Sequence, residues 1–142
     1  MKLKTIEDLD VSGKVVLVRC DFNVPIDEDG EISDASRIER HAPTIITLVN
    51  KGAKVALLSH FGRPAGKVDE NLSLGFISES LTETFKAPEI VVIPDCIGDV
   101  TKQVLKDMPD GQIALLENVR FYEGEENNDD DFSKSLADIA DI

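Results

Sequence analysis

Short apolar runs that alternate with segments of helical spacing are the feature that most constrains the fold of this chain. The runs are rich in Val, Ile and Leu, and they occur at Lys14–Arg19, Lys54–Ser59, Ile90–Ile93 and Gln112–Leu116. Apolar runs of this length, bounded by glycine or polar residues, are typical of strands that are buried on both faces. We therefore expect four buried strands.

Apolar residues recur at helical spacing in the segments that follow these runs. Ser36 is the expected N-cap of the first helix, and Gly52 lies just past its expected end. Pro43 is expected to strain or kink this helix unless it lies near the first turn. The periodic positions are Ile38, Ala42, Ile45, Ile46 and Val49; Ile77, Leu81 and Phe85; Val100, Val104 and Leu105; and Phe132, Leu136 and Ile139.

Strands that alternate with helices predict βαβ crossovers, and hence an α/β fold with a doubly wound parallel sheet and helices on both faces. With 142 residues, the chain has the size of one domain, which we expect to span residues 1–142. The segment Asn23–Ser33, with Pro25 and an Asp29–Gly30 pair, is expected to form a hairpin-like excursion that contributes nothing to the core. No strand follows the last expected helix before Ile142, so we expect an incomplete lobe with an unpaired sheet edge.

Charge and cysteine content exclude several classes of function. Fifteen Lys and Arg residues against 28 Asp and Glu residues give a net charge of −13, which disfavours nucleic acids and anionic membranes as partners. The two cysteines, Cys20 and Cys96, form no CxxC pair, so neither a disulfide framework nor a metal site is favoured. The sequence shows no secretory h-region and no apolar run of membrane-spanning length, which predicts a cytoplasmic location.

Polar residues gather directly after three of the expected strands. In parallel sheets, ligands bind outside the carboxyl ends of the strands. Three of the five arginines lie in these segments, whereas the ten lysines are scattered elsewhere. Because guanidinium forks match phosphate oxygens, this segregation predicts a site for a small phosphorylated anion. The residues are Arg19, Asp21 and Asn23; Ser59, His60, Gly62, Arg63 and Pro64; and Glu117, Asn118, Arg120 and Phe121.

Each of these residues also has a purely structural interpretation. A single arginine is more often part of a surface ion pair, Asp21 and Asn23 are equally suited to a turn, and His60 could cap a strand. Known phosphate motifs do not apply, because the sequence contains no GxxxxGK[ST] loop and no GxGxxG after the first strand. Neighbours at a strand end point to opposite faces, so Ser59 and His60 do not form a nucleophile and base pair.

Three segments carry a resemblance to a known family. VRCDFNVP at Val18–Pro25, SHFGRP at Ser59–Pro64 and LLENVRF at Leu115–Phe121 resemble the signature segments of phosphoglycerate kinase. The resemblance runs from the first residues to Ile142 in the order and spacing of the family. It implies two α/β lobes joined by a hinge, of which the amino-terminal lobe holds phosphoglycerate and the carboxyl-terminal lobe holds the magnesium nucleotide. This chain resembles part of the former.

The resemblance also implies roles for individual residues. Arg37 would stabilise the transferred phosphoryl group and is the residue implied to be catalytic. Asp21 and Asn23 would contact the glycerate hydroxyl region, and Arg19 could bind substrate or be held by a neighbouring carboxylate. The implied substrate-binding set is Arg19, Asp21, Phe22, Asn23, Arg37, His60, Phe61, Gly62, Arg63 and Arg120, with His60, Arg63 and Arg120 on the non-transferring phosphate.

The reaction implied by the resemblance is reversible phosphoryl transfer between 1,3-bisphosphoglycerate and ADP, which gives 3-phosphoglycerate and ATP in glycolysis. Mg-ATP or Mg-ADP would bind in the carboxyl-terminal lobe of a cytoplasmic, monomeric enzyme. We expect no cofactor, metal or kinase activity in this chain alone. Two other readings stay open: a non-catalytic anion-binding module, and a structural edge whose arginines pair with Asp21, Glu117 and other carboxylates.

Overall fold

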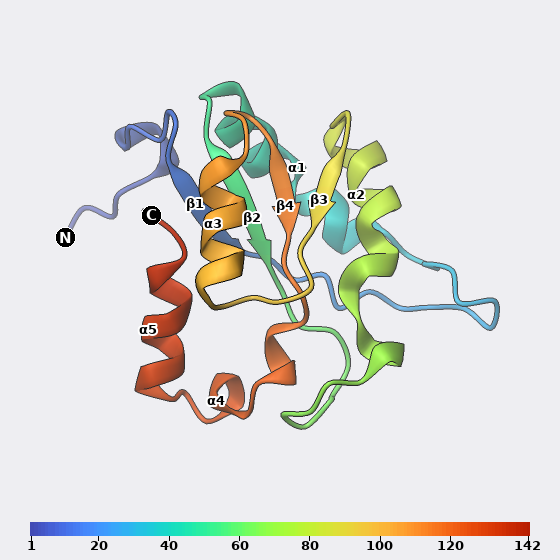
Figure 1. Ribbon diagram of the computed structural model, residues 1–142. Coiled ribbons are helices and arrows are strands. Elements are labelled where there is room, and N and C mark those ends of the chain that lie inside the picture. Colours follow the sequence, from blue (N-terminus) through green and yellow to red (C-terminus); the bar gives the residue numbers. More distant parts are fainter.

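The computed structural model describes residues 1–142 and contains one parallel sheet with the strand order β1-β2-β4-β3 (Figure 1). Its strands are β1 (Val15–Arg19), β2 (Lys54–Leu58), β3 (Ile90–Val92) and β4 (Ile113–Leu115). Every neighbouring pair is parallel. The four strands and their parallel arrangement confirm the sequence prediction.

Successive residues of the central strands alternate between two separate hydrophobic clusters, because side chains along a strand point to opposite faces. Val55 and Leu57 of β2 belong to one cluster, and Ala56 and Leu58 belong to the other. Full burial of a Leu or Ile side chain contributes about 1.5–3 kcal/mol, so both faces of the sheet stabilise the fold.

Helices cover both faces of the sheet. Figure 1 shows α3 (Asp99–Asp107) and α5 (Asp130–Asp138) in front of the sheet and α1 (Ser36–Asn50) behind it. The helix α2 (Ser78–Phe85) packs with α1, and its Leu81 and Phe85 lie in the same cluster as Ile45 of α1. This layering is the doubly wound α/β fold that the sequence predicts.

Two details of the helices differ from the sequence predictions. Ser36 does not cap α1: the N-cap position is Ala35, and the Asp34 carboxylate accepts a hydrogen bond from the Ser36 amide at 2.9 Å. Pro43 lies inside α1 on its exposed side, where the helix continues through it and the Thr47 hydroxyl donates to the Pro43 carbonyl at 2.8 Å.

Of the three periodic residues that predicted α3, only Leu105 is buried. Val100 is 79% exposed and Val104 is also exposed, whereas Thr101 and Leu105 are buried. The helix therefore turns a different face to the sheet. The presence of a helix was predicted correctly, but its buried face was only partly so.

The excursion between β1 and α1 forms the expected hairpin-like turn. Ile26 and Ile32 make an antiparallel bridge, and the Asp27 carboxylate accepts from the amides of Asp29 and Glu31. The expectation that this segment contributes nothing to the core is wrong, because Val24 is only 3% exposed and belongs to the larger cluster. Hydrophobic anchoring of Val24 therefore fixes the base of the excursion.

The last two residues lie along the outer edge of β1. The Leu17 amide donates to the Ile142 carbonyl at 2.8 Å, and the Asp141 amide donates to the Val15 carbonyl at 2.9 Å. The Asp141 carboxylate also accepts from the Val15 amide at 2.9 Å. Part of the edge that we expected to be unpaired is therefore occupied by the chain itself.

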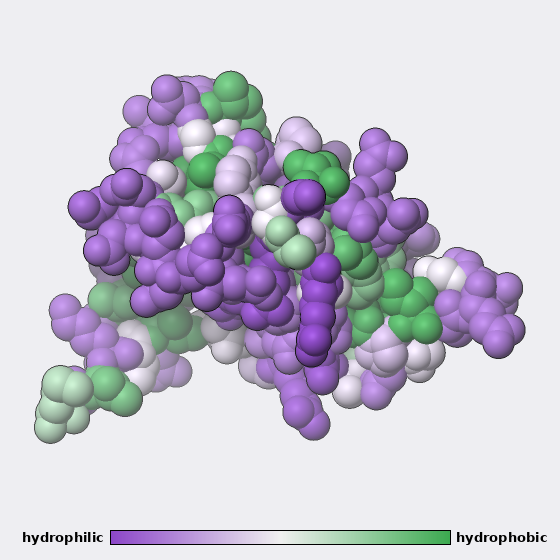
Figure 2. All heavy atoms as spheres, turned by 90° about the horizontal axis from the view of Figure 1, so that it is seen from below, coloured by the Kyte–Doolittle hydropathy of each residue, from purple (hydrophilic) through white to green (hydrophobic).

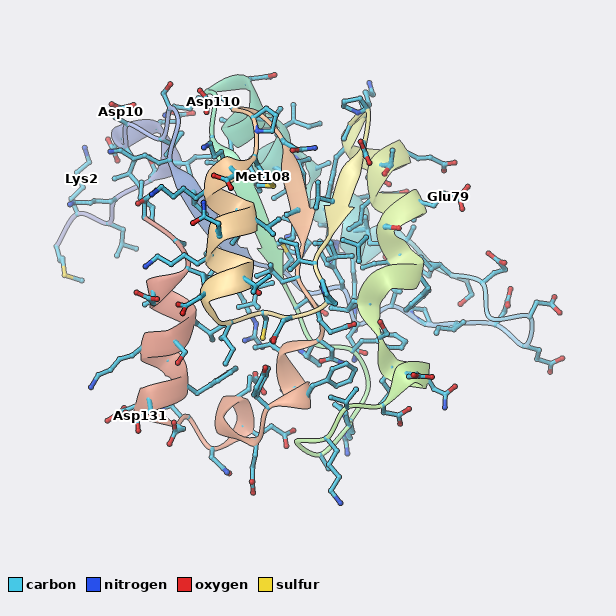
Figure 3. The ribbon with its side chains drawn as sticks, viewed as in Figure 1. Lys2, Asp10, Glu79, Met108, Asp110 and Asp131 are labelled. Atoms are coloured by element: carbon cyan, nitrogen blue, oxygen red, sulfur yellow. The ribbon has the colours of Figure 1, made fainter.

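Acidic side chains are spread over the outside of the molecule. Figure 3 shows Glu79 on α2, Asp110 before β4 and Asp131 in the first turn of α5, all at the periphery of the structure. None of the helices combines the length and the apolar character that crossing a membrane requires. The two cysteines are free and buried.

Candidate functional site

The loops that follow β1, β2 and β4 meet at the carboxyl edge of the sheet. The Phe22 amide donates to the Ser59 hydroxyl at 3.0 Å, and the Gly62 amide donates to the Asn23 side-chain oxygen at 3.0 Å. The Asn118 side chain donates to the Phe61 carbonyl at 2.7 Å. Figure 2 views the molecule from this side and shows hydrophilic side chains across the middle of the face. Sequence-predicted residues from three loops are therefore brought together.

Asn118 fixes the turn that carries Arg120. Its amide group is fully buried and also donates to the Leu72 carbonyl at 2.9 Å, while its oxygen accepts from the Arg120 amide at 3.1 Å. A buried amide that loses its partners costs about 1–3 kcal/mol, so this side chain holds the loops after β2 and β4 in one arrangement. The short 3-10 turn Val119–Phe121 is thereby placed at the sheet edge.

Gly62 occupies a position that only glycine fits without rearrangement. Its φ of +62° lies in the left-handed region, and a Cβ atom added there would lie 2.6 Å from Cδ2 of Leu72. The close approach lets the Gly62 amide reach Asn23 across the site.

A single carboxylate joins two of the predicted arginines. Glu125 belongs to the short helix α4 (Glu123–Glu126), which the sequence analysis did not predict. Its Oε1 accepts from Arg19 Nη2 at 2.8 Å, and its Oε2 accepts from Arg120 Nε at 2.8 Å. Burial raises the pKa of Glu125, but the hydrogen bonds from both arginines and their positive charges together outweigh burial and place this pKa below its ordinary value.

His60 lies beside this cluster. Its Nδ1 is buried and has no hydrogen-bond partner, which is the only such side-chain atom in the structure. Burial lowers the pKa of His60, and the positive charges of Arg120 and Arg19 lower it further. The imidazole is therefore neutral at neutral pH and offers an unused polar atom within the electrostatic reach of two guanidinium groups.

Arg37 belongs to a second group of contacts on the other side of Asn23. Its Nη1 donates to the Asn23 carbonyl at 2.7 Å and lies 3.4 Å from Oδ1 of Asp21. The Asp21 carboxylate also accepts from the Asn23 amide at 3.2 Å. Arg37 lines a surface pocket of about 390 Å³ together with Asn23, Val24, Pro25, Asp34 and Ser36. Its guanidinium is therefore held at the mouth of a polar hollow.

The structure does not join all the predicted residues through contacts. Arg37 and Arg120 belong to separate groups, and Arg63 is exposed and makes no hydrogen bond or ion pair. Glu117, which the structural reading paired with arginines, instead accepts from the Ser73 hydroxyl at 2.7 Å and from the Leu74 amide at 3.0 Å. The carboxylate that pairs with the arginines at the carboxyl edge of the sheet is thus Glu125, and it is not Glu117.

Two residues that bear on the site were missed by sequence reasoning. The Nε2 atom of His41 accepts from the Asp21 amide at 3.0 Å, and its ring makes an edge contact with Phe22. His41 lies one helical turn after Arg37, so its position on the same face of a helix was an available signal. Glu125 lies in the acidic run Glu123–Asp131, and nothing in that run distinguishes it from its acidic neighbours.

A protein metal site needs several His, Cys, Asp or Glu side chains close together. No three His, Cys, Asp or Glu side chains come together in a way that could hold a metal ion.

Comparisons with known proteins agree with this arrangement. The sequence model of the family described as phosphoglycerate kinase matches residues 6–142. Phosphoglycerate kinase from Trichodesmium erythraeum is 51% identical over 145 residues, a match that covers 100% of this chain and 36% of that protein. The enzyme from Rhizobium johnstonii is 51% identical over 140 residues, covering 98% and 34%. The chain therefore spans about a third of the length of the curated relatives that it matches.

Solved structures show the same fold. The phosphoglycerate kinase structure from Pyrococcus horikoshii superposes with a TM-score of 0.84 at 28% identity, covering 98% of this chain and 35% of that one. The structure from Coxiella burnetii gives a TM-score of 0.82 at 33% identity, covering 96% and 33%.

Proposed function

This chain belongs to the phosphoglycerate kinase family, and we propose that residues 1–142 are the part of such a kinase that binds the phosphorylated glycerate. The complete enzyme would transfer a phosphoryl group reversibly between 1,3-bisphosphoglycerate and ADP, giving 3-phosphoglycerate and ATP. This chain would hold 3-phosphoglycerate or 1,3-bisphosphoglycerate at the carboxyl edge of its sheet, and it would be inactive alone.

One observation carries the proposal. Arg19, at the end of β1, and Arg120, in the turn after β4, are far apart in the sequence, yet both reach Glu125 beside the unpartnered Nδ1 of His60. The remaining N–H groups of both guanidiniums have no acceptor in the protein. A phosphate would satisfy them, because each charge-assisted hydrogen bond to an ionised group contributes about 1.5–3 kcal/mol. In a chain of net charge −13, such a local cation cluster is what an anionic substrate requires.

The second group of contacts suits the reacting end of the substrate. Arg37 would stabilise the charge on the phosphoryl group in transfer and is the residue that we assign as catalytic. Asp21 and Asn23 would accept and donate hydrogen bonds at the glycerate hydroxyl. Phosphoryl transfer depends mainly on positioning and electrostatic stabilisation. The Arg37 guanidinium, held by Asn23 and Asp21, would supply both at the reacting end of the substrate.

Most of the remaining residues that we propose to bind substrate lie in the loop after β2. Gly62 permits the close approach that places Arg63, and the exposed guanidinium of Arg63 would complete the phosphate cradle with His60 and Arg120. Phe22 and Phe61 are buried and would shape the pocket from below.

The nucleotide would be held outside these residues. We propose that Mg-ATP or Mg-ADP binds to a second lobe joined through a hinge, and that the longer chain works as a cytoplasmic monomer. The magnesium ion would be held with the nucleotide in that lobe.

Calorimetric titration of the 142-residue chain tests this proposal. We expect weak binding of 3-phosphoglycerate, no measurable binding of ATP and no kinase activity. Replacing Arg120 by Gln should weaken phosphoglycerate binding about tenfold or more, because one charge-assisted pair is lost. The matched control is Arg40→Gln, which removes an exposed arginine outside the proposed site and should leave binding unchanged. Tight ATP binding, or equal effects of the two substitutions, would contradict the proposal.

A further inference from the structure

Glu125 is a carboxylate inside a site that is proposed to bind an anion. Simple electrostatics would make it unfavourable there, because a negative charge repels phosphate. The carboxylate is nevertheless the shared partner of Arg19 and Arg120, at 2.8 Å from each. The arrangement therefore calls for a physical reason.

The side chains of Glu125, Arg120 and Arg19 differ in how deeply they are buried. The Glu125 side chain is 11% exposed, whereas Arg120 is 26% and Arg19 is 49% exposed. The Glu125 side chain is therefore more deeply buried than either arginine side chain. Glu125 is thus placed to support the arginines and is poorly placed to compete with an incoming ligand.

The pattern of hydrogen bonds supports the same conclusion. Glu125 takes one N–H from Nη2 of Arg19 and one from Nε of Arg120. Both terminal nitrogens of Arg120, and Nε and Nη1 of Arg19, keep their N–H groups free of protein acceptors. The carboxylate therefore fixes the orientation of each fork and leaves most of its donors available.

Two guanidinium groups that stand close together also repel one another. The carboxylate between them offsets this repulsion. It also restricts the rotamers of both arginines before a ligand arrives, so that less side-chain entropy is lost on binding. Its neighbour Glu126 does not share this role, because its carboxylate is 53% exposed and lies 3.7 Å from Arg120 Nε.

We propose that Glu125 is a positioning residue of the substrate site, which holds Arg19 and Arg120 as one preorganised double fork for the phosphate group of the ligand. The inference rests on the proposed function and extends it to a residue that makes no contact with substrate. Its consequence is counterintuitive: removing a negative charge from an anion site should weaken anion binding.

The test is a calorimetric titration of four forms of the 142-residue chain with 3-phosphoglycerate: wild type, Glu125→Gln, Glu125→Asp and Glu126→Gln. We expect Glu125→Gln to bind about tenfold more weakly, because an uncharged amide offers one acceptor oxygen to two forks. Glu126→Gln removes the same charge one residue away and should bind as tightly as wild type or slightly more tightly. Weaker binding by Glu125→Gln together with unweakened binding by Glu126→Gln would distinguish positioning from simple charge repulsion.

The aspartate variant adds a second discrimination. It keeps the charge but shortens the side chain by one methylene group, so that its carboxylate no longer spans both arginines. We expect it to bind more weakly than wild type, whereas an account based on charge alone predicts no change. Thermal unfolding followed by circular dichroism establishes which variants are folded at the titration temperature.

An independent readout is the NMR signal of the arginine Nε–Hε groups in the chain without ligand. In wild type and in Glu126→Gln, we expect an Arg120 Nε–Hε signal that is protected from exchange with water. In Glu125→Gln, we expect this signal to be lost. If wild type binds no 3-phosphoglycerate, the proposed function fails, while this signal still tests whether Glu125 orders Arg120. Unweakened binding by Glu125→Gln, or an Arg120 signal that this substitution leaves unchanged, would overturn the inference.

Discussion

Ser59 and Asn118 are two of the three buried polar side chains of the chain, and each of them joins loops from different strands. Their hydrogen bonds are worth more than surface contacts, because an unpaired polar group in this dry environment would be costly. The charged residues at the surface of the site are held by this neutral layer. At the scale of single residues, then, the site is a set of exposed cations on a buried polar frame.

His60 provides a pH-dependent test at this scale. Its pKa is lowered from 6.5 in the folded chain by burial and by Arg120 and Arg19, so the unfolded chain binds more protons as the pH falls through this range. Stability therefore rises with pH: the contribution of His60 is present above 6.5 and is lost as the pH falls toward the folded pKa. We expect the urea midpoint to fall from about pH 7.5 to about pH 5.5 more in wild type than in His60→Gln.

Parallel urea titrations of the two forms at several pH values measure this difference. The single variant Arg120→Gln, which retains His60, is a useful companion. Removing one of the charges that lower the pKa of His60 should bring the histidine titration, followed by NMR, closer to its ordinary value. A His60 signal that titrates above 6.5 in the folded chain would show that the arginines do not act on this ring as described.

Sequence reasoning identified most exposed residues of the site but few of the contacts that hold them. Arg19, His60 and Arg120 could be predicted because arginines and a histidine after buried strands have a clear chemical meaning. The partner of Arg19 could not be predicted, because Glu125 lies 106 residues away in the sequence and its position depends on how α4 is placed. A run of acidic residues has the same appearance in the sequence whether or not one of them is buried under two arginines.

At the scale of elements, the four strands and the four longer helices were predictable, whereas the short helix α4 and the contacts between loops were not. The strands follow from apolar runs, and both faces of each central strand are covered. The buried faces of helices were harder to predict: α3 buries Thr101 and Leu105 and leaves Val100 exposed. The loops depend on single close approaches, of which Gly62 against Leu72 is the tightest in the site.

Replacing Gly62 by Ala tests that dependence. We expect a loss of about 1–3 kcal/mol in the free energy of unfolding, from the positive φ together with the 2.6 Å approach to Leu72. The matched control is Gly30→Ala, where φ is +80° but no atom lies within 4 Å of the added Cβ; the cost there should be about 1 kcal/mol. Urea unfolding of both variants gives the comparison, and equal losses would mean that the contact with Leu72 adds nothing.

At the scale of the whole molecule, the two ends of the sheet carry different cations. The carboxyl edge holds arginines, whereas the amino edge has a pocket of about 530 Å³ whose lining includes Lys54, Lys102 and Lys106. Arginine presents oriented forks, while lysine presents a mobile point charge that is more strongly hydrated. We therefore predict that a phosphorylated glycerate binds at the carboxyl edge, although both ends of the sheet carry cationic side chains.

The most direct measurement of this claim is a titration of the 15N-labelled chain with 3-phosphoglycerate, followed amide by amide. We predict that the largest chemical-shift changes occur at Arg19, Asn23, Gly62 and Arg120, in the loops at the carboxyl edge, and that Lys54, Lys102 and Lys106 stay unchanged. Shifts centred on the lysine-lined pocket, or spread evenly over both ends, would contradict the account.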